Sequence, residues 1–346
     1  MTRRLAILAV LLLTFLVVAQ EFGAERGRFF ELARKFELKA QAMPPTGFDH
    51  PSAPLFQMVW LSDMHIESQT IRLETQKLLE QIHQEIQPLA VLITGDNWGI
   101  GEKPWQRQKD FQAFLRETLH KTPTIVLPGD NWPEAFHEVF GTDTYAFTLG
   151  GFRFVCASVD ASGGRKGCSI FAQDTLGWLK MQLAQAGGHP VIYIQHEPVE
   201  PPMMLDAPKI AAMLDDTPSV LLALGGHLHL NLALPRKHWC QWVAPSTRQP
   251  RSAFKVLSFY TDAMTAQDWE KPSGQEKYLP VGKYLLVRIP MEFRKSLHAV
   301  SKFQMEDYQA MPARARKIDS ALDARVQEIN RMLTMYAFRF VVNQLF

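Results

Sequence analysis

Short apolar runs alternate with stretches of helical periodicity through the middle of the chain. Runs of four to eight mainly apolar residues predict strands at 56–62, 89–94, 124–127, 152–159, 191–194 and 220–224. Apolar residues at helical spacing predict helices at 70–87, 105–120 and 173–186. Gly150 and Gly151 separate 147–148 from 152–159, which indicates a hairpin. Strands that alternate with helices and then give way to hairpins predict an α/β layered fold.

The segments on either side of this region follow other patterns. Residues 25–41 have the periodicity of a surface helix, and the prolines between 44 and 54 then predict an extended linker. Residues 262–278 are polar and rich in turn formers, so we expect a loop there. Residues 284–289 are expected to form a late strand.

The C-terminal stretch predicts an amphipathic helix. Apolar residues recur there at steps of three or four, at Ile318, Leu322, Val326, Ile329 and Leu333. The apolar residues 335–346 that follow are interrupted by polar side chains, and this end is too short and too polar to cross a bilayer. We expect the helix to dock on the body of the protein, and contact with a partner or a membrane surface is the alternative.

Residues 1–19 have the layout of a secretory signal. Arg3 and Arg4 precede an apolar run, and Val17 and Ala19 supply the small residues that precede a cleavage site. The run has about 15 residues, fewer than the roughly 20 that span a bilayer. We therefore expect an exported protein, periplasmic or secreted, with an uncleaved N-terminal membrane anchor as the alternative.

The charge of the chain gives no reason to expect a polyanionic partner. The sequence has 37 Lys and Arg against 35 Asp and Glu, a formal net charge of +2. Cleavage after Ala19 would remove Arg3 and Arg4 and leave 35 of each sign. Nucleic-acid binders usually show a basic surplus or a basic stripe, so nucleic acid is disfavoured as a partner. Arg248, Arg251 and Lys255 could together contact one phosphate group.

The cysteine count also limits the class of protein. Three cysteines are too few for a disulfide-stapled scaffold. Cys156 and Cys168 could pair after export, with Cys240 left over. Buried free thiols are the alternative, and the sequence does not decide between the two.

Five of the apolar runs are followed directly by residues of metal-binding types. In chain order the five motifs are Asp63-Met64-His65, Gly95-Asp96, Gly129-Asp130-Asn131, Gln195-His196 and Gly226-His227-Leu228-His229. Ligands of open α/β sheets bind outside the carboxyl ends of the strands, so we expect these aspartates and histidines on one rim. The glycines at 95, 129 and 226 are expected to let the backbone turn sharply where the strands end.

The residue types indicate a metal centre. Carboxylate and imidazole ligands suit zinc, manganese and iron. Seven such groups exceed the needs of one tetrahedral site, and they fit two metal ions about 3.5–4 Å apart that share one carboxylate. If the segments are extended, Asp63 and His65 point to the same side, as do His227 and His229. The sequence therefore predicts two divalent or trivalent metal ions as cofactors, with Mn, Zn or Fe as the candidates.

This series of motifs resembles that of the calcineurin-like metallophosphoesterase superfamily. The family's motifs are D-x-H, G-D, G-N-H-D/E, a lone H and G-H-x-H, and the resemblance covers roughly residues 55–248. It implies a four-layer αββα sandwich. It also implies a phosphoesterase in which a metal-bridging hydroxide attacks phosphorus in line while the metals clamp the phosphoryl oxygens.

The resemblance assigns a role to each of the seven residues. One metal would be held by Asp63, His65 and His229, and the second by Asp130, His196 and His227. Asp96 would bridge the two metals. Glu67 and Glu197 have no place in the motifs but could line the rim. The remaining candidates are expected to be solvated or structural, namely Asp160, His120, His137 and His238.

The third motif departs from the family pattern. Asp130 stands where the family has its metal-binding asparagine, which is tolerable because a carboxylate oxygen can replace an amide oxygen. Asn131 replaces the histidine thought to protonate the leaving group, and asparagine cannot transfer a proton near neutral pH. Trp132 replaces the carboxylate that orients that histidine. General acid catalysis typically contributes about 10²–10⁴-fold, so its loss should slow substrates with poor leaving groups most.

Two functions are compatible with this site. The first is an exported hydrolase for a small phosphoester, either a diester or an activated monoester, in which Asn131 donates a hydrogen bond to a phosphoryl oxygen. The second is a catalytically weak, metal-loaded envelope protein that binds a phosphorylated ligand or partner. Gly99 occupies the position where purple acid phosphatases carry a tyrosine, so a colourless protein is expected. Trp98 and Trp132 could form aromatic walls near the metals.

The sequence thus divides into four regions. Residues 1–19 are expected to be the signal peptide, and 20–54 the N-terminal helix and proline-rich linker. The metallophosphoesterase core is expected at 55–261. Residues 262–346 would add a loop, a late strand and the C-terminal helix. Membrane contact could come from an uncleaved N-terminal segment or from the C-terminal end, and the sequence does not set the oligomeric state.

Overall fold

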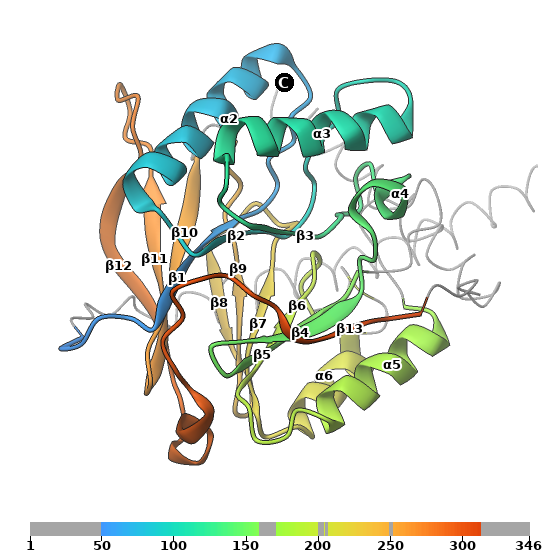
Figure 1. The fold of residues 1–346 in the computed structure, drawn as a ribbon, viewed down its shortest axis with the longest axis vertical. Coiled ribbons are helices and arrows are strands. Elements are labelled where there is room, and N and C mark those ends of the chain that lie inside the picture. Colours follow the sequence, from blue (N-terminus) through green and yellow to red (C-terminus); the bar gives the residue numbers. More distant parts are fainter. Residues whose placement is uncertain (1–49, 159–170, 200–203, 205–206, 249–251, 313–346) are drawn as a thin grey trace, which may run out of the picture. The chain divides into compact units, whose positions relative to one another are not determined.

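Two mixed β-sheets lie face to face at the centre of the fold (Figure 1). The computed structural model describes residues 50–158, 171–199, 204, 207–248 and 252–312. In spatial order the first sheet contains β12 (Leu279–Arg288), β11 (Ala263–Glu270), β10 (Ala253–Phe259), β1 (Phe56–Leu61), β2 (Ala90–Ile93) and β3 (Thr124–Val126). The second contains β13 (Glu306–Ala310), β4 (Tyr145–Leu149), β5 (Phe152–Cys156), β6 (Val191–Ile194), β7 (Val220–Gly225), β9 (Cys240–Val243) and β8 (Leu232–Pro235).

Helices cover the outer face of each sheet. The first sheet carries α2 (Gln69–Gln81), which continues into the π-helix η1 (Ile82–Ile86), and α3 (Pro104–Leu119). The second sheet carries α5 (Gln173–Ala184) and α6 (Ala207–Asp215). Two short helices lie in connections, α4 (Phe136–Phe140) and the 3-10 helix η2 (Met291–Ser296). The predicted four-layer αββα architecture is therefore confirmed.

The sequence explains why these elements form where they do. β1, β2 and β6 are buried on both faces, as parallel strands between two layers usually are, and they read as continuous apolar runs. Helix α2 begins where the Ser68 side chain accepts a hydrogen bond from the backbone N–H of Ile71, and α3 begins at Pro104. Between the sheets, the ring of Phe152 meets the rings of Phe56 and Phe259 edge-on. These contacts form a dry core between the two inner faces.

The loop expected at 262–278 is wrong over its first half. Residues 263–270 form β11, which pairs with β10 on one side and with β12 on the other. The segment looked like a loop because its composition is polar, yet Ala263, Met264 and Ala266 are buried and Asp268 is buried beside a lysine of β10. The late strand is confirmed within β12. Because β11 and β12 extend the first sheet and β13 extends the second, the sandwich continues past residue 261.

Several expectations concern segments outside the described residues. These are the signal peptide at 1–19, the helix at 25–41, the C-terminal helix at 318–333, Asp160, Cys168 and Arg251. Cys156 and Cys240 are free, buried thiols. Among the described residues, none of the helices combines the length and the apolar character needed to cross a membrane.

Candidate metal centre

The seven predicted ligand residues meet at the carboxyl ends of five strands. Asp63 and His65 follow β1, Asp96 follows β2 and Asp130 follows β3. His196 follows β6, and His227 and His229 follow β7. Side-chain donor atoms close enough to hold a metal ion form three overlapping groups, Asp63–His65–His229, Asp130–His196–His227 and Asp63–Asp96–His196. The structure thus brings all seven residues together. The first two groups have the same members as the two ligand sets that the resemblance implies.

Asp96 lies between the two groups. Its Oδ2 atom is 3.3 Å from Nε2 of His65, and its Oδ1 atom is 3.5 Å from Nε2 of His196. On one side, Nε2 of His229 is 3.3 Å from Oδ1 of Asp63. On the other, Nδ1 of His227 is 3.3 Å from Oδ1 of Asp130. Asp96 therefore offers one carboxylate oxygen to each side, an arrangement that suits a bridging ligand.

The backbone of the site is strained. Five of the seven residues have positive φ angles, namely Asp63 (52°), His65 (42°), Asp96 (53°), His227 (68°) and His229 (54°). A side chain in this region costs on the order of 1–2 kcal/mol per residue. The expectation that Asp63-x-His65 and His227-x-His229 are extended is therefore wrong, because the strands end before these residues and tight turns bring the side chains together. Such strain is typical of functional sites that the surrounding structure holds in place.

Glycines make room for the carboxylates. Gly95 has a φ of 118°, which fits the expected sharp turn after β2. Gly129 has a different reason to lack a side chain, since a Cβ atom there would collide with the carboxylate and backbone nitrogen of Asp96. Similarly, a Cβ atom on Gly226 would collide with the side chains of Ser62 and Asp63. Close approach to the site, rather than an unusual turn, explains these two glycines.

Comparison with solved structures identifies the fold. A dimetal phosphatase from Danio rerio matches with a TM-score of 0.50 at 15% sequence identity, and the match covers 68% of this chain and 99% of the other. The chain has the calcineurin-like metallophosphoesterase fold. At this identity, the likeness shows the fold alone.

Two further solved structures match with scores just below that value. A purple acid phosphatase from yellow lupin seeds has a TM-score of 0.49 at 14% identity, covering 69% of this chain and 55% of the other. An anchor protein of the inner membrane complex of Plasmodium has a TM-score of 0.49 at 12% identity, and the match covers 68% of this chain and 89% of the other. No family model and no curated protein matches the sequence.

The donor set of this metallophosphoesterase fold suits metal ions. Nδ1 of His196 donates a hydrogen bond to the carbonyl oxygen of Thr94 at 2.7 Å. The other ring nitrogen, Nε2, therefore faces the carboxylates. That buried Nε2 atom has no hydrogen-bond partner among the described residues. It lies 3.4 Å from Oδ1 of Asp130 and 3.5 Å from Oδ1 of Asp96. A backbone carbonyl behind an imidazole whose other nitrogen faces carboxylates is the usual surrounding of a metal-binding histidine.

The protonation of the site without metal also indicates that these residues suit metal ions. Burial would raise the pKa of Asp63, but the hydrogen bond from His229 and the nearby imidazoles hold it at about 2. Burial would lower the pKa of His227, yet its hydrogen bond to Asp130 and the charge of that carboxylate raise the pKa to about 9. The carboxylates of Asp96 and Asp130 likewise raise the pKa of His196 well above its ordinary value, against the effect of burial. Without metal, protons on imidazoles balance the aspartates.

Metal binding is therefore expected to release protons. Below pH 9 the metal-free His227 is protonated, and a metal ion must displace that proton. The apparent affinity for Mn²⁺ or Zn²⁺ should then fall by at least about tenfold for each unit that the pH is lowered from 8 to 6. Calorimetric titration in buffers of different ionisation enthalpy measures both quantities. An affinity that does not change with pH would contradict this protonation.

Asn131 lies inside the ligand cluster. Its side-chain amide donates to Oδ2 of Asp96 at 2.6 Å and to Oδ1 of Asp130 at 3.2 Å, and its backbone N–H donates to Oδ1 of Asp96 at 2.8 Å. Both amide hydrogens are thus used within the site. Donation to a phosphoryl oxygen, the role expected from the sequence, would require the amide to leave one of these carboxylates.

The two tryptophans differ in position. The ring of Trp132 meets the ring of His65 edge-on with 5.7 Å between ring centres, so it lies beside the candidate metal ligands. Trp98 packs instead against Phe111 and Phe114 in the core beneath α3, and its indole N–H donates to the carbonyl of Ile100. The expectation of an aromatic wall at Trp98 is wrong, because the chain after β2 turns this ring towards the helix layer.

Two acids and an arginine accompany the ligands. Oε1 of Glu67 lies 3.5 Å from Nδ1 of His65, and Nη1 of Arg248 lies 3.2 Å from the same oxygen. Glu67 therefore lies at the rim, as expected. Glu197, next to His196, is fully buried. His137 contacts Asp143 at 3.1 Å, His120 packs against His83, and His238 bonds the carbonyl of Thr217, so these three histidines have structural contacts.

Lys255 does not reach a phosphate group, which corrects the sequence expectation. It is fully buried in β10, where its ammonium group donates to Asp268 of β11 and, at 2.7 Å, to Oδ1 of Asn231. The Asn231 amide in turn donates to Oδ2 of Asp268 at 2.6 Å. Asn231 follows His229 by two residues. This network therefore ties the loop that carries His227 and His229 to the first sheet.

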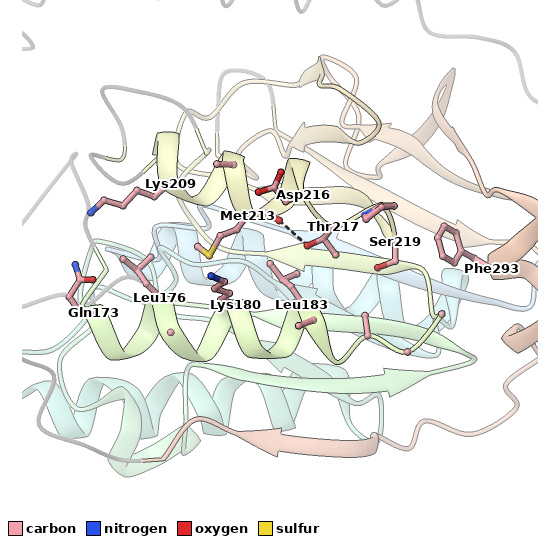
Figure 2. A pocket seen from close by; sticks show the side chains of 17 residues that line it. Gln173, Leu176, Lys180, Leu183, Lys209, Met213, Asp216, Thr217, Ser219 and Phe293 are labelled. Carbon is pink, nitrogen blue, oxygen red and sulfur yellow. Dashed lines mark hydrogen bonds between the residues drawn. The ribbon is translucent and has the colours of Figure 1, made fainter.

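A separate hollow lies between α5 and α6 (Figure 2). It has a volume of about 830 Å³. Leu176, Leu183 and Met213 form its apolar part, and Lys180 and Lys209 also line it. None of the candidate metal-ligand groups found among the described residues lies there. Among the described residues, the candidate metal-ligand groups lie at the strand ends.

Proposed function

We propose that this chain is a metal-dependent phosphoesterase with a dinuclear centre. The observation that carries the proposal is the Asp96 carboxylate, which presents one oxygen to each of two three-residue ligand groups. Asp63, His65 and His229 would hold one metal, Asp130, His196 and His227 the other, and Asp96 both. When bound, two such ions polarise a phosphoryl group and activate a water for in-line attack.

The residues of the chain fix where this chemistry happens. The Asp63 carboxylate accepts two hydrogen bonds from the backbone N–H of His227, at 3.1 and 3.0 Å, which locks the two loops together. The Ser246 hydroxyl donates a hydrogen bond to the carbonyl oxygen of Asp63 at 2.7 Å and so also holds the backbone of Asp63 in place. The ring of Trp132 packs against the ring of His65. The ligands are therefore positioned before a metal or substrate arrives.

The site favours substrates with good leaving groups. Asn131 cannot supply a proton, and its amide is bonded to two carboxylates. We therefore expect diesters or monoesters with acidic leaving groups to be cleaved faster than simple alkyl monoesters, by about 10²-fold or more. Manganese or zinc added to the purified full chain should support hydrolysis of bis-4-nitrophenyl phosphate. No turnover of any activated ester with both metals bound would reject the hydrolase.

A second candidate function is binding of a phosphorylated ligand without catalysis, because the proton donor and its partner are missing at positions 131 and 132. Asn131 and Trp132 replace a proton donor and its partner, and Asn131 instead donates hydrogen bonds to the carboxylates of Asp96 and Asp130. A metal-loaded protein that only binds a phosphorylated ligand would show saturable binding of phenylphosphonate without turnover of activated esters. Hydrolysis of those esters excludes this alternative.

Replacing Asn131 with alanine is expected to weaken metal binding. The change removes hydrogen bonds to both Asp96 and Asp130 and leaves their charges less balanced. Loss of such outer partners typically costs about 10–100-fold in metal affinity. Calorimetric Mn²⁺ titration of Asn131→Ala measures the effect. Asn97→Ala is a matched control, since that amide donates to the carbonyl of Leu127 instead. Unchanged affinity would show that Asn131 does not position the ligands.

We also propose that the protein is exported, on the evidence of residues 1–19 alone. N-terminal sequencing of the protein purified from its native envelope tests this. A new N-terminus at Gln20 is expected, and an intact Met1 in a soluble cell extract would contradict export. A small phosphoester is the expected partner of the site. Any membrane contact would come from an uncleaved N-terminal segment or from the C-terminal end.

A further inference from the structure

A small polar pocket lies between α2 and the segment after β9. We call it the Arg248 pocket, and its polar lining consists of Glu74, Thr75, Thr247, Arg248, Ser252, Lys271 and Tyr278. Its volume is about 130 Å³, which is the share of about four liquid water molecules. A phosphate or carboxylate group fits such a space.

Arg248 connects this pocket to the metal centre. Its Nη1 atom is 3.2 Å from Oε1 of Glu67, and the same oxygen is 3.5 Å from Nδ1 of His65. Its backbone N–H donates at 3.1 Å to the hydroxyl of Ser246, which itself bonds the backbone of Asp63. A single carboxylate therefore separates the guanidinium from a candidate metal ligand. A molecule bound at the metals could reach the pocket without leaving the rim.

The lining of the pocket suits an oxyanion. Arg248 and Lys271 are cationic, and Glu74 is the acid on the α2 side, so the lining has a net positive charge. Ser252 and Tyr278 are buried and bonded to each other through their hydroxyl groups. Among the described residues, no acid lies within ion-pair distance of the Lys271 ammonium. Arg248 uses one terminal nitrogen for Glu67 and keeps further N–H groups for a ligand.

We propose that the Arg248 pocket binds a second oxyanion of the substrate, a phosphate or a carboxylate, while the first phosphoryl group lies at the metals. This rests on the proposed function and narrows it, because the preferred substrate then carries two anionic groups a few bonds apart. Glu67 pairs with Arg248 until an anion of the substrate takes its place. Arg248 and Lys271 are specificity residues rather than metal ligands.

The experiment compares three probes on the manganese-loaded full chain. Propylphosphonate has one anion, 3-phosphonopropionate adds a carboxylate, and propane-1,3-bisphosphonate adds a second phosphonate. Isothermal titration should show that at least one of the two-anion probes binds about tenfold more tightly than propylphosphonate, as expected for charge-assisted hydrogen bonds. The probe with the larger gain shows whether the second anion is a carboxylate or a phosphate.

Variants test which residues cause the tighter binding of the two-anion probes. Lys271→Ala and Arg248→Ala should each remove most of the tenfold preference, and Lys271→Ala should leave the affinity for propylphosphonate unchanged. Lys277→Ala is the matched control, because its ammonium lies on the same connection but pairs with Glu85 outside the pocket. It should keep the preference. Equal binding of all three probes, or a preference that survives both pocket variants, would overturn the proposal.

The outcome is separable from that of the proposed function. Turnover of bis-4-nitrophenyl phosphate is measured on the same preparations. Turnover without any two-anion preference rejects the pocket and keeps the hydrolase. A preference that Lys271→Ala removes, in a chain without turnover, supports the pocket and rejects the hydrolase.

Discussion

Replacing Asp96 with asparagine is expected to lower kcat for an activated phosphoester by about 10³-fold or more, which corresponds to roughly 4 kcal/mol of activation free energy. The carboxylate has one oxygen towards His65 and one towards His196. An amide offers a single acceptor oxygen, so its NH₂ group would face one of the two ligand groups. It would also face the donors of Asn131, which now bond both oxygens. The variant should therefore lose at least one metal.

Asp215→Asn is the matched control for this change. Asp215 lies at the end of α6, before β7 begins, and its Oδ1 atom accepts a hydrogen bond from the indole of Trp239 at 2.7 Å. The same chemical change there occurs at the edge of the sheet opposite the metal centre, and kcat should stay within about twofold. Metal content and turnover are measured on both variants. If Asp96→Asn kept more than about a tenth of the turnover, a bridging role for Asp96 would be ruled out.

Replacing Asp268 with leucine is expected to lower the free energy of unfolding by about 3–5 kcal/mol. Lys255 is fully buried, and Asp268 is the carboxylate that balances its charge. Without it, a cation remains in the core, and among the described residues the Asn231 amide is its one remaining hydrogen-bond partner. Urea unfolding of the metal-free chain measures the loss.

Two comparisons separate buried charge from lost packing. The double variant Lys255→Met with Asp268→Leu removes both charges and should recover most of the loss. Burial lowers the pKa of Lys255, against the charge of Asp268. Because the folded state of Asp268→Leu would release the lysine proton more readily than the unfolded state does, its deficit should shrink as the pH rises towards 10.5, the ordinary pKa of lysine. A deficit that is equal at all pH values would indicate lost packing alone.

The layered fold and the members of the site could be predicted because both depend on local patterns. Apolar runs mark strands buried on two faces, and the residues directly after them must lie at the strand ends. Asp63, Asp96 and His196 were identified in this way, from three separate strands. Residue type then limits the chemistry, since carboxylates and imidazoles suit few cofactors other than metals.

What the sequence could not predict depends on contacts between distant segments. Polar residues such as Asp268 give 262–278 the composition of a loop. The sequence does not show that Asp268 pairs with Lys255, 13 residues away, and this pairing explains how the carboxylate can be buried in a strand. Asp63 and His229 have positive φ angles, and the hydrogen bond from the backbone of His227 to Asp63 joins their loops across 164 residues. Asn131 looked like a substrate contact, and its bonds to Asp96, 35 residues earlier, appear only in three dimensions.

The central claim is that the seven residues form a phosphoesterase centre with two metal ions. The most direct test is to titrate the metal-free full chain with Mn²⁺ or Zn²⁺ and to follow turnover of bis-4-nitrophenyl phosphate at each addition. Turnover should appear with metal and reach its plateau at two equivalents per chain. A chain that holds two equivalents and hydrolyses no activated ester would contradict the claim.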